Sequence, residues 1–186
     1  MNKVIFFLLL AMLSFAACED ENTIDADLHY DGANESAPFL DIGTWEAAAR
    51  FPANVMMEFQ GKNLTEVEFF ILERPDACAI HIYGEGTSDA AGTLLYSENV
   101  SNSVNANSWN RHMLSTPLVI SGEEDLWISV VVTHNSPLAS VGCDAGPAEL
   151  NGDWTYSDGD GEWQTLNFRT NQRVDINWNI RGYIGE

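Results

Sequence analysis

Basic residues are scarce in this 186-residue chain, which has 8 Lys and Arg against 28 Asp and Glu, and its formal net charge at pH 7 is −20. A surface field of that sign repels nucleic acid, so we expect no nucleic-acid partner. Catalytic signatures are lacking as well. The four histidines are scattered, and there is no His-Glu-x-x-His pair, no Gly-x-Ser-x-Gly turn and no phosphate-binding loop. We therefore expect a binding protein and not an enzyme.

The one long apolar run lies at the N-terminus. Lys3 precedes ten apolar residues, 4–13, and two alanines then lead into Cys18. The run is too short to span a hydrocarbon layer of about 30 Å comfortably. A positive charge, an apolar run and small residues, in that order, are typical of a secretory signal. The cysteine directly after them resembles that of a bacterial lipobox, which is acylated and becomes the first mature residue. We predict a lipoprotein signal peptide over residues 1–17 and lipidation of Cys18.

A short acidic segment follows the predicted lipidation site. Residues 18–28 lack hydrophobic periodicity and are rich in Asp and Glu, which is typical of a solvated tether. The acidic residues 19–21 resemble the surface-export signal of Bacteroidota lipoproteins. We therefore predict an outer-membrane lipoprotein that is exposed on the cell surface and held to the membrane by its N-terminal lipid anchor.

Beyond the tether, the hydrophobic pattern has a period of two, which is typical of strands with one buried face. Trp178 shares its face with Ile176 and Ile180, so we predict that it lies in the core. The only helix-compatible stretch is 45–50, which Phe51-Pro52 ends. We predict an all-β, single-domain antiparallel sandwich over residues 29–186. The predicted strands are 67–71, 78–83, 93–100, 108–115, 126–132, 162–168 and 174–181.

The remaining cysteines, Cys78 and Cys143, have no paired spacing that would indicate a zinc site. In an exported and oxidising setting they could form one disulfide. Alternatively, Cys78 is a small core residue, because it lies in register with Ile80 and Ile82.

Eight short segments of this chain form an ordered set: 29–32, 48–52, 64–67, 124–128, 142–148, 152–154, 163–166 and 177–183. Together they resemble the cleaved-adhesin domain, the jelly-roll module of gingipain haemagglutinin regions and of many Bacteroidota surface proteins. The resemblance covers roughly residues 29–184. It implies a jelly-roll β-sandwich, surface display, structural calcium and adhesion to host or matrix ligands.

Aspartates in the predicted loops are candidates for holding calcium, which takes six to eight oxygen ligands. Asp144 and Asp153 flank a loop bent by Gly and Pro, and Asp31 follows a short segment near the mature N-terminus. A chain this acidic has aspartates in most loops, so these three could equally be solvated surface. Residues 158–162 resemble the start of an EF-hand loop, but they lie between two strand candidates and are better interpreted as a hairpin tip.

Aromatic side chains could stack on sugars, since a flat apolar face matches the C–H face of a pyranose. The candidates are Trp109, Trp127, Trp154 and Trp163. A row of polar residues in the last predicted strand could line a concave ligand face. We predict Trp109, Trp154, Asn177, Asn179 and Arg181 as ligand-binding residues. Core packing and solvated strand exteriors are the alternatives.

These observations lead to three hypotheses of different classes. The first is a lipid-anchored adhesion or ligand-binding module for a host or matrix protein or glycan, stabilised by calcium. The second is an accessory or structural envelope lipoprotein that partners another surface protein. The third is a small glycoside-active enzyme, which requires two carboxyl groups roughly 5–10 Å apart in a cleft.

Overall fold

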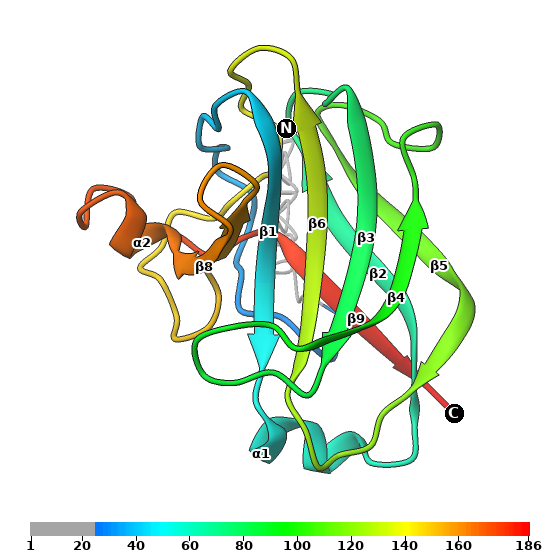
Figure 1. Cartoon of the computed structure of the whole chain (residues 1–186). Coiled ribbons are helices and arrows are strands. Elements are labelled where there is room, and N and C mark those ends of the chain that lie inside the picture. The colour runs from blue at the N-terminus through cyan, green and yellow to red at the C-terminus, as the bar shows by residue number, and fades with distance from the viewer. Residues whose placement is uncertain (1–24) are drawn as a thin grey trace, which may run out of the picture.

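The computed structural model describes residues 25–186, so the predicted signal peptide, Cys18 and most of the tether lie outside the described residues. Two antiparallel sheets pack face to face as a β-sandwich (Figure 1). One sheet has six strands in the order β4-β3-β6-β1-β7-β8, and the other has three in the order β5-β2-β9. No helix within residues 25–186 is long and apolar enough to cross a membrane. The all-β sandwich expected from the period-two pattern is confirmed.

The strands of the larger sheet are β1 (Gly43–Phe51), β3 (Ala77–Gly84), β4 (Thr93–Asn99), β6 (Leu126–His134), β7 (Trp154–Ser157) and β8 (Glu162–Thr165). Those of the smaller sheet are β2 (Asn63–Ile71), β5 (Ser108–Val119) and β9 (Ile180–Gly185). Three short helices complete the fold: α1 (Ala53–Met56), η1 (Met57–Phe59) and α2 (Leu166–Arg169).

The core lies between the two sheets and follows the predicted alternation. In β3, Cys78, Ile80 and Ile82 are buried, and the opposite positions of β6 are buried with them. Trp178 is only 1% exposed and belongs to this core, as predicted. Its indole N–H donates to the carbonyl of Trp154 at 2.9 Å, so the buried polar atom of this large side chain has a partner.

Cys78 and Cys143 are both buried and free, and no disulfide joins them. Cys78 lies in β3 opposite Val132, whereas Cys143 forms isolated bridges with Ser36 and Trp178 outside the named strands. The Cys143 sulfur lies 3.3 Å from the Ser36 hydroxyl. The structure therefore supports the alternative interpretation, in which Cys78 is a small core residue.

The helix-compatible interpretation of residues 45–50 is wrong, because this segment forms most of β1. Its three consecutive alanines favour a helix locally. However, β1 pairs with β6 on one side and β7 on the other, so it is a central strand. Ala47 and Ala49 face the core, while Ala48 is buried on the opposite face. Burial on both faces removes the alternation by which a strand is recognised.

Two other predicted strands are shorter in the structure. The segment 174–181 becomes a regular strand only at Ile180, and Trp178 contributes an isolated bridge. The segment 162–168 divides into β8 and α2, where the Thr165 side chain accepts a hydrogen bond from the backbone N–H of Phe168 at 3.2 Å and caps the helix. β7 and β8 form a hairpin whose tip lies at residues 158–161, as predicted.

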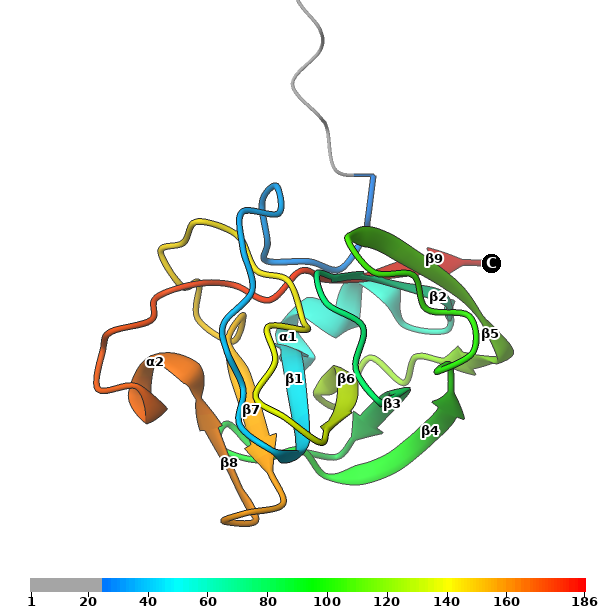
Figure 2. The same cartoon turned by 90° about the horizontal axis from the view of Figure 1, so that it is seen from above.

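Two features at the margins of the larger sheet matter for function. The loop between β3 and β4, residues 85–92, runs across the front of β6 and β1 toward β8 (Figure 1). The β7–β8 hairpin and α2 extend beyond the edge of the smaller sheet, as the view from above shows (Figure 2). Both features surround the face of the larger sheet that points away from the core.

Candidate functional site

The outward face of the six-stranded sheet carries a cluster of aromatic side chains. Side chains alternate between the two faces of a strand, so residues paired across neighbouring strands point the same way. Tyr83 of β3 pairs with Trp127 of β6, and Tyr156 of β7 pairs with Trp163 of β8. Trp154 lies two residues before Tyr156 and shares its face. We call these five residues, which come from four strands, the aromatic face.

The rings of the aromatic face pack closely against one another. The centroid of Trp127 lies 5.1 Å from that of Trp154 and 5.3 Å from that of Trp163. Tyr83 meets Trp163 edge-on at 6.0 Å. Aromatic pairs at such distances contribute about 0.5–1.5 kcal/mol each beyond the burial of their area. The cluster is separate from the core between the sheets and forms a firm platform on the outside of the sandwich.

A shallow hollow of about 290 Å³ lies on the β8 side of the aromatic face. Trp154 and Trp163 line it together with Phe168, whose ring is 70% exposed. Asp89 from the β3–β4 loop adds a carboxylate. Trp127, in contrast, is fully buried beneath its neighbours. The aromatic face therefore has an accessible part, which can contact a ligand, and a supporting part.

Two indole N–H groups in this cluster are buried without a hydrogen-bond partner among residues 25–186, those of Trp127 and Trp154. A buried donor without a partner costs about 1–3 kcal/mol, so most such groups in folded proteins are satisfied. Gly86 of the β3–β4 loop lies directly over the Trp127 nitrogen, where an added Cβ would approach to 2.7 Å. Both nitrogens are enclosed by the protein, so these two donors belong to the supporting part of the cluster and are closed to a ligand.

Glu46 lies at the centre of the same sheet face and is only 8% exposed. Its carboxylate accepts hydrogen bonds from the Tyr83 hydroxyl at 2.8 and 2.9 Å and from the Ser129 hydroxyl at 2.7 Å. The His81 ring nitrogen lies 3.6 Å away. Burial, and then the nearby Glu46 charge, raise the pKa of Tyr83, so this hydroxyl stays protonated and keeps donating. Glu46 therefore positions Tyr83 within the aromatic face.

Of the predicted ligand-binding residues, only Trp154 belongs to this face. Trp109 and Arg181 lie on the outside of the smaller sheet, where the guanidinium stacks over the indole ring at 3.7 Å. The polar row is not a solvent-facing ligand surface, because Asn177, Asn179 and Arg181 are 2%, 0% and 8% exposed. The reason is that two loops cover the row. Asn179 and Arg181 donate hydrogen bonds to Asp31, and the Asn177 amide donates to Asp144 and to the carbonyl of Pro147.

The predicted calcium ligands each have protein partners. Asp31 accepts hydrogen bonds from Arg181 at 2.8 Å and from the Asn179 amide at 2.8 Å. Asp144 accepts from the backbone N–H groups of Gly32 and Asn177, and Asp153 from that of residue 167 at 3.0 Å. Burial raises the pKa of Asp31 and of Asp153.

This donor set does not fit a calcium ion at Asp31, because a guanidinium already holds that carboxylate. Within residues 25–186 no group of three or more His, Cys, Asp or Glu side chains is arranged to hold a metal. The three carboxylates instead fix loops by accepting hydrogen bonds. A structural calcium ion stays a prediction, which removal of calcium tests.

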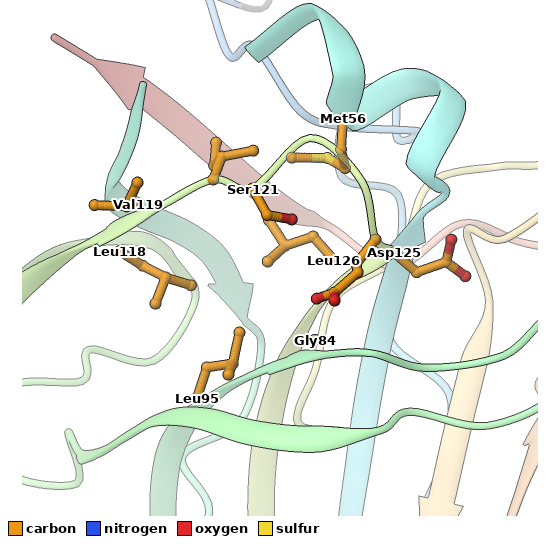
Figure 3. Close-up of a pocket in the computed structure, with 10 residues that line it drawn as sticks. Met56, Gly84, Leu95, Leu118, Val119, Ser121, Asp125 and Leu126 are labelled. Carbon is orange, nitrogen blue, oxygen red and sulfur yellow. The ribbon is translucent and has the colours of Figure 1, made fainter. Parts of the chain in front are cut away.

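A smaller, separate hollow opens at one end of the sandwich, between β4, β5 and the start of β6 (Figure 3). Leu95, Leu118 and Leu126 line it together with Met56. Its volume is about 70 Å³, well below the roughly 300 Å³ of the smallest typical ligand pockets. The aromatic face is therefore the stronger candidate site.

The sequence identified part of this site. Trp127, Trp154 and Trp163 are among the sugar-stacking candidates that the sequence offers, but Tyr83 and Glu46 are not. Tyr83 follows Ile82 in an alternating strand and so points outward, which is a signal that could have placed it. Glu46 was missed because its strand was interpreted as a helix.

No known protein family, curated protein or solved structure matches this chain. We therefore infer function from the geometry of the residues themselves, and the cleaved-adhesin resemblance stays a prediction.

Proposed function

We propose that this protein is a lipid-anchored, surface-exposed module that captures glycans on the aromatic face. The observation that carries the proposal is an open hollow lined by aromatic rings together with polar side chains. Trp154, Trp163 and Phe168 supply the rings, and the polar groups come from Asp89, Gln164 and Thr165.

A sugar matches this arrangement in two ways. The C–H face of a pyranose is flat and apolar, so it packs on an aromatic ring, while its hydroxyl groups bond to polar side chains such as Asp89 and Gln164 of the hollow. Ligand sites are generally apolar with a few placed polar groups. A glycan therefore fits better than a purely apolar ligand, which would cover the polar side chains of the hollow without bonding to them.

We propose the location of the module from its predicted lipoprotein signal peptide and from its resemblance to cleaved-adhesin domains. Acylation of Cys18 and the acidic tether would hold the domain off an outer membrane, facing outward. The jelly-roll topology and adhesive role of cleaved-adhesin domains are compatible with a sandwich that binds on a sheet face. We propose adhesion to host or matrix glycans, with matrix proteins as the rival ligand class.

We propose capture without cleavage. Glycoside hydrolysis requires two carboxyl groups that act as acid and base or nucleophile. Glu46 is the carboxylate buried at this face, and its oxygens are occupied by two hydroxyl donors. It holds Tyr83 in place and is not presented to a ligand.

The test is a glycan array probed with the purified lipoprotein in detergent, followed by calorimetry on the glycans that bind. Trp163→Ala should weaken binding at least tenfold, or about 1.4 kcal/mol, because truncating a central aromatic contact typically costs that or more. Trp109→Ala is the matched control, since it removes a tryptophan from the opposite sheet.

Three outcomes would contradict the proposal. Loss of binding in Trp109→Ala but not in Trp163→Ala would move the site to the smaller sheet. Binding only to proteins would favour the rival ligand class. Hydrolysis of the bound glycan would show an enzyme. Urea unfolding of each variant verifies that the fold is retained.

A further inference from the structure

Phe168 is a large apolar side chain held out from the molecule, at 70% exposure. It belongs to α2, which follows β8 directly and lies beside it at the free end of the larger sheet (Figure 1). Two hollows share this ring in their lining. One is the hollow of the aromatic face, and the other, of about 750 Å³, extends toward residues 171–172. Phe168 is thus part of the wall common to two neighbouring depressions, and we call this wall the ridge.

The ridge is fixed to the sandwich. Leu166 is 4% exposed and anchors α2, and its backbone N–H donates to the Asp153 carbonyl at 2.7 Å. The N–H of Asn167 donates to the Asp153 carboxylate at 3.0 Å. The Thr165 cap completes the attachment at Phe168. The exposure of Phe168 is therefore a property of an ordered turn.

The second hollow is lined by amide side chains. Gln164, Asn167, Asn171 and Gln172 all contribute. The amides of Gln164 and Asn167 each donate one hydrogen bond within the chain, and each keeps its acceptor oxygen and a second donor. Asn171 and Gln172 have φ angles of 52° and 62°, in the left-handed region that residues other than glycine rarely adopt. Two such residues in succession are costly, and strain of this kind gathers at functional sites.

The charge around the two hollows is not that of an anion site. Asp89 lines the first hollow, and the chain as a whole carries a formal charge of −20. Arg169 reaches the second hollow, but its guanidinium is occupied by Asp160 and by the hydroxyl of Thr155. Among the residues that line the two hollows, an acidic sugar would therefore meet one carboxylate and a guanidinium that is already paired, whereas an uncharged sugar would not be repelled.

We infer that the two hollows are successive subsites for an uncharged oligosaccharide, which crosses Phe168 from the aromatic subsite to the amide subsite. This inference rests on the proposed glycan binding. In the aromatic subsite, one sugar packs on Trp163 and Phe168. In the amide subsite, the hydroxyl groups of the next sugars bond to amide donors and acceptors. Linking the two contacts within one ligand makes the second an intramolecular event, so affinity rises with chain length.

The test measures affinity against chain length by calorimetry on the full mature protein in detergent. The probes are cello-, chito- and malto-oligosaccharides of one to six units. For the series that binds, affinity should rise at least tenfold from one unit to three or four and then level off. Acidic oligosaccharides of matched length, such as oligogalacturonides, should bind at least tenfold more weakly.

Two variants separate the subsites. Asn171→Gly removes the amide but keeps the left-handed backbone, because glycine adopts positive φ freely. It should weaken binding of long oligomers at least threefold and leave the shortest binding ligand unchanged. Phe168→Ala should weaken binding at every length. Leu150→Ala is the control, since it truncates another side chain that is 83% exposed.

The outcomes separate this inference from the proposed function. Affinity that does not change with length, together with an Asn171→Gly variant that binds like the wild type, overturns the two-subsite inference and leaves glycan capture intact. Stronger binding of the acidic oligomers also overturns it. No binding of any series by the folded protein overturns both.

Discussion

The ion pair between Asp31 and Arg181 offers a sharp test of how the loops before β9 are held. The Asp31 side chain is fully buried and that of Arg181 is 10% exposed. The pair is held by contacts of 2.8 and 3.0 Å from two guanidinium nitrogens. Burial is the largest influence on Asp31 and raises its pKa, against the opposing effect of Arg181 and Asn179. Pairing therefore does not fully offset the cost of removing this carboxylate from water.

Removing one partner is nevertheless expensive, because it leaves the other charge buried. Asp31→Ala should cost about 3–5 kcal/mol, the range for breaking a buried pair. The value should fall toward the lower end, since Glu68 remains 3.5 Å from the guanidinium and Trp109 still stacks on it. Against a typical total of about 5–15 kcal/mol, such a loss would leave the domain marginal.

A double-mutant cycle measured by urea unfolding checks this. Asp31→Ala, Arg181→Met and the double variant are compared at the same pH and ionic strength. The double variant should cost less than the sum of the single ones, because it leaves no unpaired charge. A cost below about 1 kcal/mol for Asp31→Ala, or strict additivity, would refute the reasoning.

The same measurements decide the calcium prediction for Asp31, Asp144 and Asp153. An ion bound only by the folded state would add about 2.7 kcal/mol at a hundredfold excess over its Kd. EDTA would then lower the free energy of unfolding, and Asp144→Asn would blunt the response. If Arg181 neutralises Asp31 and no calcium ion is bound, EDTA should leave the free energy of unfolding unchanged. Magnesium at matched ionic strength is the control for general screening of the acidic surface, since it fits loop-built calcium sites poorly.

Three further predictions follow from burial and anchoring. Trp178→Ala should cost about 3–5 kcal/mol in thermal or urea unfolding, because the side chain is 1% exposed, and a cost below about 1 kcal/mol would contradict its place in the core. Burial raises the pKa of Cys78 to about 12 and also raises that of Cys143, so both thiols should resist a thiol reagent at pH 8 until the protein is unfolded. A disulfide between them would instead leave neither thiol reactive after unfolding. Cys18→Ser should release the protein to the soluble fraction, and membrane association that survives carbonate washing would count against the lipobox.

The sequence by itself determined the class of the fold, because strand periodicity is a local property. Alternation in β3 and β6 identified which side chains enter the core, and the same pattern placed Trp178 there. The β7–β8 hairpin was recognisable since turn residues separate two short strand candidates. These features depend only on residues close together in the chain.

The tertiary structure decided which residues meet. The alanines of β1 favour a helix locally. In the structure this segment pairs on both edges, and it is the central strand that carries Glu46. Asn177 and Asn179 form a polar row in the sequence, but in the structure the loop at Asp144 covers the first and the loop at Asp31 covers the second. The aromatic face joins Tyr83, near the end of β3, to residues about 70–80 positions later in the sequence. Such contacts depend on strand order and register across the sheet, and a linear pattern of hydrophobicity does not encode them.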